Sequence, residues 1–192
     1  MIGIVDLERA EADLAAGELA CPGCGATLRR WGYGRARQVR DHGSAMLTLR
    51  PRRARCVACG VTQVLLLTAV LPRRADTTAV IGTALLASAR GVGYRRIAAE
   101  VGRPESTVGR WVRSVRGRHT EWLHAQGVAW IHDVDREMLA TITPAPTRLG
   151  DALTALAAAA VAVRARLIPH VPLWTLIGRF TDGRLIPATR AG

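Results

Sequence analysis

Hydrophobic residues recur every three or four positions along most of the chain, a spacing typical of helices, whereas short strand-like runs are confined to its first third. Near the start, Leu7, Ala10 and Leu14 have helical spacing. Asp6 precedes them as a suitable N-cap, and Gly17 ends the pattern. We therefore expect a short leading helix.

Short extended segments with intervening turns follow this helix. Strands are expected at 27–31, 46–50, 53–56 and 61–68, and turns at 32–34 and 41–43. A connection at 71–74 contains Pro72, which disfavours a strand there. The pattern predicts a small ribbon of strands.

Three helical patterns come next. The first is expected to be capped by Asp76 and to end at Gly91, with a buried stripe made of Val80, Ile81, Ala84, Leu85 and Ser88. The second lies between Gly93 and Gly102, with Ile97, Ala98 and Val101 inward. The third starts with Pro104 at its first helical position and runs to Arg116, with Val108, Trp111, Val112 and Val115 inward. Two short helices joined by such a tight turn form a helix-turn-helix.

The last part of the chain is expected to be helical packing material. After a linker marked by Pro144 and Pro146, a long helix over 151–167 presents a narrow apolar ridge made of Leu153, Leu156, Ala160 and Val163. A short helix over 171–180 could cover this layer. The ridge could pack on the helix-turn-helix or on a second copy of the chain, so a homodimer is a hypothesis.

These elements predict an α+β fold that is mostly α. The expected divisions are a leading helix at 1–20, a four-cysteine ribbon at 21–70, a helix-turn-helix domain at 71–118, and a helical packing or oligomerisation region at 119–192.

All the cysteines of the chain lie in two CxxC-Gly motifs, and they are Cys21, Cys24, Cys56 and Cys59. Two such short loops can supply the four thiolates of one structural Zn²⁺. Two disulfides or a redox CxxC are the alternatives. No long apolar segment precedes the first motif, so the sequence shows no secretory signal and favours zinc.

Charge is concentrated in the middle of the chain. Residues 1–28 hold one Arg against five acidic residues, 29–118 hold 19 against four, and 119–192 hold seven against six, which makes net charges of −4, +15 and +1. The absence of Lys and Asn suggests a GC-rich coding sequence, but codon bias does not explain this segregation. A polyanion such as double-stranded DNA is the expected partner. No apolar run is long enough to span a bilayer, so we expect a cytoplasmic protein associated with the nucleoid through DNA.

The outer face of the third helix of the trihelical unit carries the predicted DNA contacts. It presents Ser106, Gly109, Arg110, Arg113 and Arg116. We expect base contacts from Ser106, Thr107 and Arg110, and phosphate contacts from Arg113, Arg116, Arg95 and Arg96. A helical hairpin with a merely solvated basic face is the alternative.

Arginines also surround two aromatic residues of the ribbon, Trp31 and Tyr33. They are Arg29, Arg30, Arg35, Arg37, Arg50, Arg52 and Arg53. This group could add phosphate contacts or bind single strands by stacking, and the sequence leaves both open.

The order of these motifs resembles that of a known module. Cys-Pro-x-Cys-Gly, a second CxxC-Gly, Gly-Val-Gly-Tyr-Arg-Arg-Ile-Ala at 91–98 and Ser-Thr-Val-x-Arg-Trp-Val at 106–112 are similar to the zinc-ribbon and helix-turn-helix module of bacterial insertion sequences, over roughly residues 21–116. The resemblance implies zinc ligation by the four cysteines and a recognition helix at 104–116. In that family the module occurs in transposases and in short accessory proteins.

A transposase of this kind would continue into a catalytic domain whose dispersed carboxylates hold Mg²⁺. Only 74 residues follow Arg118 (192 − 118), and the cluster of Asp133, Asp135 and Glu137 fits a charged helix face better than a metal site. We therefore expect a non-enzymatic, sequence-specific DNA-binding protein, acting as a mobile-element accessory factor or a transcription regulator. The alternative is the DNA-binding fragment of a split or decayed transposase, with a transposase or integrase as its partner.

Overall fold

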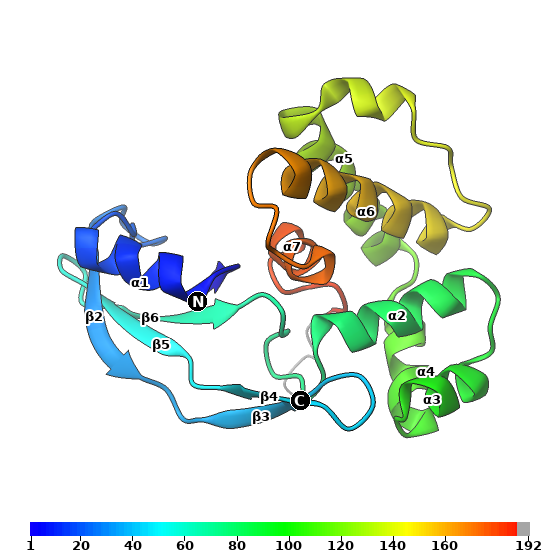
Figure 1. The fold of residues 1–192 in the computed structure, drawn as a ribbon, viewed down its shortest axis with the longest axis horizontal. Helices are drawn as coiled ribbons and strands as arrows, with labels where there is room; N and C mark the ends of the chain where they lie inside the picture. Colours follow the sequence, from blue (N-terminus) through cyan, green and yellow to red (C-terminus); the bar gives the residue numbers. More distant parts are fainter. Residues whose placement is uncertain (188–192) are drawn as a thin grey trace.

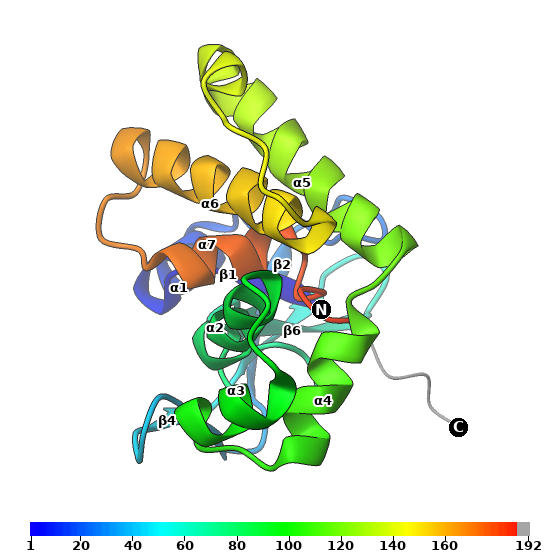
Figure 2. The ribbon, with the colours of Figure 1, turned by 90° about the vertical axis from the view of Figure 1, so that its right-hand side faces the viewer.

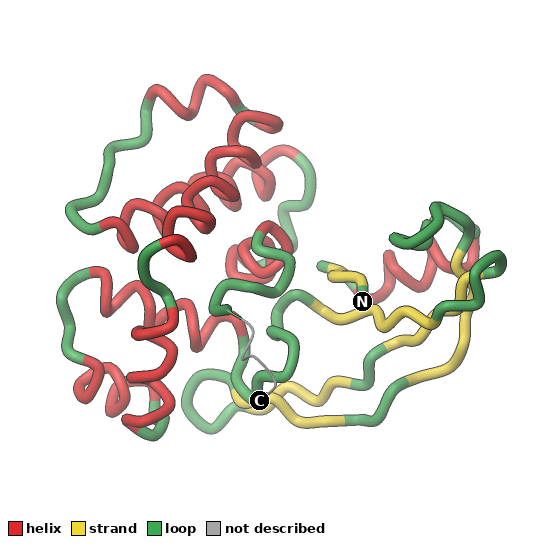
Figure 3. Tube along the Cα trace, turned by 180° about the vertical axis from the view of Figure 1, so that it is seen from behind, coloured by secondary structure: helices red, strands yellow, loops and turns green. Residues whose placement is uncertain are grey.

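The computed structural model of the protein describes residues 1–187, with strands at one end and most of the helices at the other (Figures 1 and 3). We refer to residues 1–70 as the sheet unit and to residues 71–187 as the helical unit. The fold is α+β, and helices make up its larger part, as the sequence predicts.

The sheet unit contains one four-stranded sheet and a separate hairpin. The sheet has the order β1 (Ile2–Ile4), β6 (Thr62–Leu67), β5 (Arg52–Cys56) and β2 (Leu28–Tyr33). β1 runs parallel to β6, and the other two neighbouring pairs are antiparallel. The hairpin consists of β3 (Arg37–Arg40) and β4 (Met46–Leu49). It projects toward the helical unit (Figure 1).

The leading helix is present as α1 (Leu7–Ala16). Its cap is the predicted one, because the Asp6 carboxylate accepts hydrogen bonds from the backbone amides of Glu8 and Arg9. Gly17 ends the helix in the left-handed conformation, with φ of 77°.

The strand predictions are partly wrong. β2 continues through Gly32 and Tyr33, where a turn was expected, because Gly32 takes a φ of 94° and absorbs an irregularity in the pairing with β5. The sequence pattern also missed β1 and β3. The turn at 41–43 is confirmed as the tip of the hairpin.

The helical unit begins with a trihelical group and continues with a second helical layer. The trihelical group consists of α2 (Thr78–Ala89), α3 (Tyr94–Val101) and α4 (Glu105–Ser114). The second layer consists of α5 (Arg118–Val134), the short 3₁₀ helix η1 (Arg136–Ala140), α6 (Arg148–Arg166) and α7 (Leu173–Phe180). α5 and α6 lie side by side above the trihelical group (Figure 2). None of the described helices has the length and apolar character that crossing a membrane requires.

One hydrophobic core joins the trihelical group to the second layer. It includes residues from α2, α3, α4, α5, α6 and α7, and the predicted α6 ridge is buried within it. Contact between α5 and α6 is very close at Gly127, where an added Cβ would lie 2.7 Å from backbone atoms of Ala155 and Leu156. The apolar ridge that motivated the homodimer hypothesis is therefore covered by the chain itself.

Thr68, directly after β6, connects the two units. Its hydroxyl donates to the carbonyl of Thr175 in α7, at 2.8 Å, and its own carbonyl accepts from the hydroxyl of Thr78 in α2, at 2.9 Å. Gly178 lets α7 approach the same carbonyl, since an added Cβ there would lie 2.1 Å from the Thr68 oxygen. All these groups are buried, so the sheet unit is anchored on both helical layers.

Candidate metal centre and nucleic-acid interface

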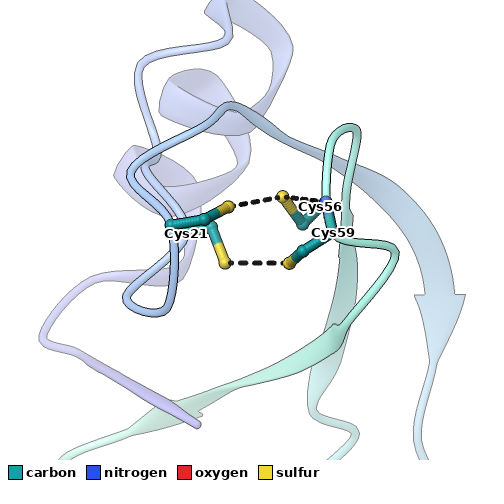
Figure 4. A group of neighbouring side chains, drawn as sticks. Cys21, Cys56 and Cys59 are labelled. Carbon is teal, nitrogen blue, oxygen red and sulfur yellow. Dashed lines mark hydrogen bonds between the residues drawn. The ribbon is translucent and has the colours of Figure 1, made fainter.

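The four cysteines meet between two facing loops of the sheet unit (Figure 4). Cys21 and Cys24 come from the loop before β2, Cys56 is the last residue of β5, and Cys59 lies in the turn between β5 and β6. The Sγ atoms of Cys21 and Cys59 are 3.8 Å apart, those of Cys24 and Cys56 are 3.4 Å apart, and all four sulfurs lie within 4.8 Å of one another. A tetrahedral zinc ion with Zn–S bonds near 2.3 Å requires sulfurs about 3.8 Å apart. The donor set therefore fits one structural zinc ion.

The backbone of each loop turns in the same way around its sulfurs. Gly25 and Gly60 take φ values of 75° and 71°, and their amides donate to the carbonyls of Cys21 and Cys56. The amide of Cys59 also donates to the sulfur of Cys56, at 3.5 Å. Side chains with a Cβ disfavour this conformation, so the glycine after each second cysteine is needed for the turn.

Electrostatics at this cluster favours a bound cation. The pKa of the Cys56 thiol is lowered to about 6, chiefly because the Cys59 amide donates to it. The amide of Val61 favours the Cys59 thiolate, but the sulfur of Cys56, then burial, then the sulfurs of Cys24 and Cys21 raise the pKa of Cys59 to about 11. One thiolate thus opposes ionisation of the next. A divalent ion would remove that repulsion.

The disulfide alternative receives less support from this geometry. The short sulfur–sulfur distances join the two loops, so they argue against a redox disulfide within one CxxC motif. The four sulfurs also lie close enough together to share one ion.

The trihelical group has the predicted helix-turn-helix. α3 ends at Gly102, in the left-handed conformation with φ of 64°, and α4 starts two residues after Arg103. Pro104 is the N-cap rather than the first helical residue, and the helix ends at Ser114, before the predicted limit at Arg116. The inward residues Val108, Trp111 and Val115 are buried as predicted, and Val112 is partly buried.

The outward side of α4 carries most, not all, of the residues predicted for it. Ser106, Arg110 and Arg113 are exposed, and Arg116 is exposed just beyond the helix. Gly109 is instead buried, since an added Cβ would lie 3.4 Å from the Tyr94 ring and 3.0 Å from an Arg113 nitrogen. α3 crosses closely at this point, so Gly109 has a packing role.

Thr107 and the two arginines of α3 surround this face. Thr107 is half-buried. Arg95 pairs with Glu105 at 3.5 Å and Arg96 with Glu100 at 3.1 Å, and all four side chains are at least half exposed. Exposed pairs of this kind are weak, so both guanidiniums can turn toward a phosphate.

Arg74 is a basic residue of this region that the sequence reasoning passed over. Burial first, and then the nearby charge of Arg110, lower the pKa of its guanidinium. Arg74 donates to the carbonyl of Pro187 at 2.7 Å, which restrains its side chain. The signal in the sequence was the Arg73-Arg74 pair, which had been treated only as a connection.

A buried ionic group joins the hairpin to the helix-turn-helix. Asp76 was expected to cap α2, but Thr77 does so by accepting from the amide of Val80. Asp76 is buried and pairs with Arg103, from the turn before α4, and with Arg40, from β3. The Asp76 carboxylate therefore links the end of β3, through Arg40, to the turn after α3, through Arg103.

The acidic residues at and after the end of α5 do not converge. Asp133 is exposed beside His132, Asp135 pairs with Arg166 of α6, and Glu137 lies in η1. α5 ends at Val134, so these residues do not share one helix face as expected. Within residues 1–187, the four cysteines form the one group of three or more metal-ligating side chains close enough to share an ion.

Comparison with protein families identifies the trihelical group. A family described as a homeodomain-like domain matches residues 78–120, which span α2, α3, α4 and the start of α5. The comparisons with curated proteins and with solved structures gave no match. The chain thus contains a homeodomain-like helix-turn-helix domain beside a sheet unit with a four-cysteine site.

Proposed function

We propose that this chain is a double-stranded DNA-binding protein that places α4 in the major groove. The observation that carries the proposal is the homeodomain-like domain at 78–120, whose α4 exposes Arg110 and Arg113 on one side. Acidic residues are scarce there, since Glu105 is the one carboxylate of α4. A major groove admits one helix, and a guanidinium fork matches the O6 and N7 atoms of guanine.

The two ends of α4 have different roles in this proposal. Ser106 and Thr107 lie in its first turn and Arg110 near its middle, and these three read base edges, because the N-terminal residues of a recognition helix contact the bases. Arg113 and Arg116 lie toward its far end and contact phosphates, together with Arg95 and Arg96 of α3. Arg74 adds positive charge next to Arg110.

A zinc ion held by the four cysteines has a structural role in this proposal. Four thiolates leave no open coordination position for a water molecule. The sheet unit has a small hydrophobic core of its own, so the ion stabilises it and thereby the β3–β4 hairpin. Through Arg40 and Asp76 that hairpin contacts the turn before α4.

We further propose that the chain acts without catalysis, as an accessory factor of a mobile element or as a transcription regulator. The scattered positions of Asp133, Asp135 and Glu137 support a non-catalytic role, because two-metal phosphoryl transfer needs carboxylates that converge. The competing proposal is the DNA-binding fragment of a split transposase. A neighbouring gene for an integrase-like catalytic protein would favour it, and an unrelated operon would favour regulation.

The direct test is selection of bound fragments from randomised and genomic DNA by the purified, zinc-loaded protein near physiological salt. We expect a defined sequence motif, located either at repeated element ends or at promoters. Enrichment without a motif would contradict sequence-specific recognition, because any protein this basic holds DNA at low salt.

Two substitutions in α4 test the division of roles. Arg110→Ala should relax the sequence preference and weaken binding to the selected site by about 1–3 kcal/mol. Arg113→Ala should weaken binding to all sequences alike and lower the salt slope by about one unit. Arg148→Ala removes an exposed arginine from α6 and serves as the control. Identical behaviour of the first two variants would contradict the assignment.

A further inference from the structure

The four-stranded sheet has one covered face and one open face. α1 lies along the covered face (Figure 1), where Ala10 and Leu14 pack with Leu28, Ala54 and Leu65 of the strands. Residues in alternate positions of the same strands point the other way. On β2, β5 and β6 these are Arg29, Trp31, Arg53, Arg55, Thr62, Val64 and Leu66. Leu66 is buried in one cluster with Val39 and Leu49 of the β3–β4 hairpin, so the open part of this face is formed by the other six residues.

The open face is strongly basic. Arg29 and Arg55 are direct partners across β2 and β5, and Arg55 is the partner of Thr62 across β5 and β6. The strands β2, β5 and β6 contain no acidic residue. Within residues 1–187, none of Arg29, Arg53 and Arg55 forms an ion pair with a carboxylate. Their guanidinium groups are therefore available to bind an anionic ligand.

Trp31 is the aromatic residue of this face. Half of its surface is exposed, and the guanidinium of Arg55 lies 4.6 Å from the centre of its ring. Arg55 is itself held in place, since its Nε donates to the carbonyl of Gly60 at 3.1 Å. An exposed indole beside fixed guanidiniums offers both a surface for stacking and positive charge.

Tyr33 lies on the other face, although it is only two residues away. The irregularity at Gly32 places Tyr33 opposite Arg52, whose guanidinium lies over the tyrosine ring and pairs with Glu11 of α1. Tyr33 is 48% exposed and Trp31 is 50% exposed. The two rings therefore form a natural pair for comparison.

We propose that the open face of the sheet binds single-stranded DNA, with a base stacked on Trp31 and phosphates on Arg29, Arg53 and Arg55. A duplex fits less well. The proposed binding surface spans three strands, β2, β5 and β6, with about 10 Å between the outer two, whereas a major groove about 12 Å wide accepts one helix or a two-stranded ribbon. Bases in a duplex are also stacked on one another, so the indole would have no base face to contact. An unpaired strand offers phosphates and free base faces together.

The test measures binding of the full, zinc-loaded protein to a labelled oligothymidylate and, separately, to a duplex carrying the selected site. Trp31→Ala should weaken binding to the single strand by about 5- to 100-fold and leave duplex binding within about twofold. Trp31→Phe should retain part of the affinity. Arg29→Ala and Arg53→Ala should each lower the salt slope for the single strand by about 0.7.

Tyr33→Ala is the matched control, and it should leave single-strand binding unchanged. Equal losses for Trp31→Ala and Tyr33→Ala would overturn the proposal, as would a loss with the arginine variants alone. Tighter binding to oligouridylate than to oligothymidylate would assign the face to RNA and overturn the proposal for DNA. Arg110→Ala separates this proposal from the proposed function, because it should affect the duplex alone. Zinc content and circular dichroism confirm that each variant is folded.

Discussion

The guanidinium of Arg103 and the carboxylate of Asp76 form an ion pair of 2.5 Å, and only 5% of each side chain is exposed. Arg40 pairs with the second carboxylate oxygen at 2.9 Å, and Arg103 also donates to the backbone carbonyl of Asp41. These residues belong to the hairpin, the start of α2 and the turn before α4. The position of α4 is therefore tied to the sheet unit by one buried carboxylate.

Removing this carboxylate should destabilise the protein strongly. In Asp76→Ala, the guanidinium of Arg103 would stay buried without a counter-charge, and we expect the free energy of unfolding to fall by about 3–5 kcal/mol. Urea denaturation followed by circular dichroism measures the change. DNA affinity should fall as well, since the turn before α4 loses its support.

Asp133→Ala is the control for that experiment, because the Asp133 side chain is 75% exposed and, within residues 1–187, its one ion pair is with the neighbouring His132. Its stability should stay within about 0.5 kcal/mol of the unaltered protein. Equal stabilities of the two variants would show that the buried pair does not hold the units together.

A methyl group at Gly178 should disturb the contact between α7 and the sheet unit. The added Cβ would lie 2.1 Å from the Thr68 carbonyl oxygen, which is fixed by its hydrogen bond from Thr78. Gly178→Ala should therefore cost about 1–3 kcal/mol or more, measured by thermal or urea unfolding. Gly93→Ala is the comparison, since no atom lies within 4 Å of a Cβ there. A Gly178→Ala protein as stable as Gly93→Ala would contradict the close packing.

The cysteine site should hold one zinc ion per chain. Metal analysis of the purified protein, with a thiol titration under denaturing conditions, should show one zinc and four reactive thiols. Chelation should lower the melting temperature and weaken DNA binding, because the sheet unit supports the turn before α4. Cys59→Ser should mimic chelation. Two disulfides and no zinc would contradict the site, as would DNA binding and circular dichroism that survive complete metal removal.

The apolar ridge of α6 should stabilise the fold of a single chain rather than a dimer. Leu156 is fully buried against the rest of the helical unit, so Leu156→Ala should reduce the free energy of unfolding by about 2–5 kcal/mol. Light scattering at micromolar concentration should give the same mass for the variant and the unaltered chain. A dimer that dissociates in the variant would instead assign the ridge to the contact between two copies.

Local patterns in the sequence were sufficient to predict α1, α2, α3, α4, α6 and α7 and the grouping of the cysteines, but they gave no bounds for α5. In α4, Val108, Trp111 and Val115 recur at helical spacing, and Gly102 ends α3 in a conformation that favours glycine. The two CxxC-Gly motifs likewise encode their own turns. In each case the residues that determine the structure are neighbours in the sequence.

Several predictions failed because they depend on residues that are far apart in the sequence. Asp76 looks like a helix cap until Arg103 is known to lie beside it, and Gly109 looks exposed until Tyr94 packs over it. The edge strand β1 is too short for an alternating hydrophobic pattern to be recognised, and it forms because it pairs with β6. Such features depend on tertiary contacts, which a local propensity does not contain.

The parallel pairing of β1 with β6 also affects how the chain assembles on the ribosome. Ile2 lies beside Leu65, so the first strand to be synthesised has no partner until the whole ribbon has emerged. α1 can form early, and α2, α3 and α4 can fold later from contacts close in sequence. β1 is thus made before β6 and is placed only after β6 has emerged, and during that interval the apolar residues of β1 are open to chaperones.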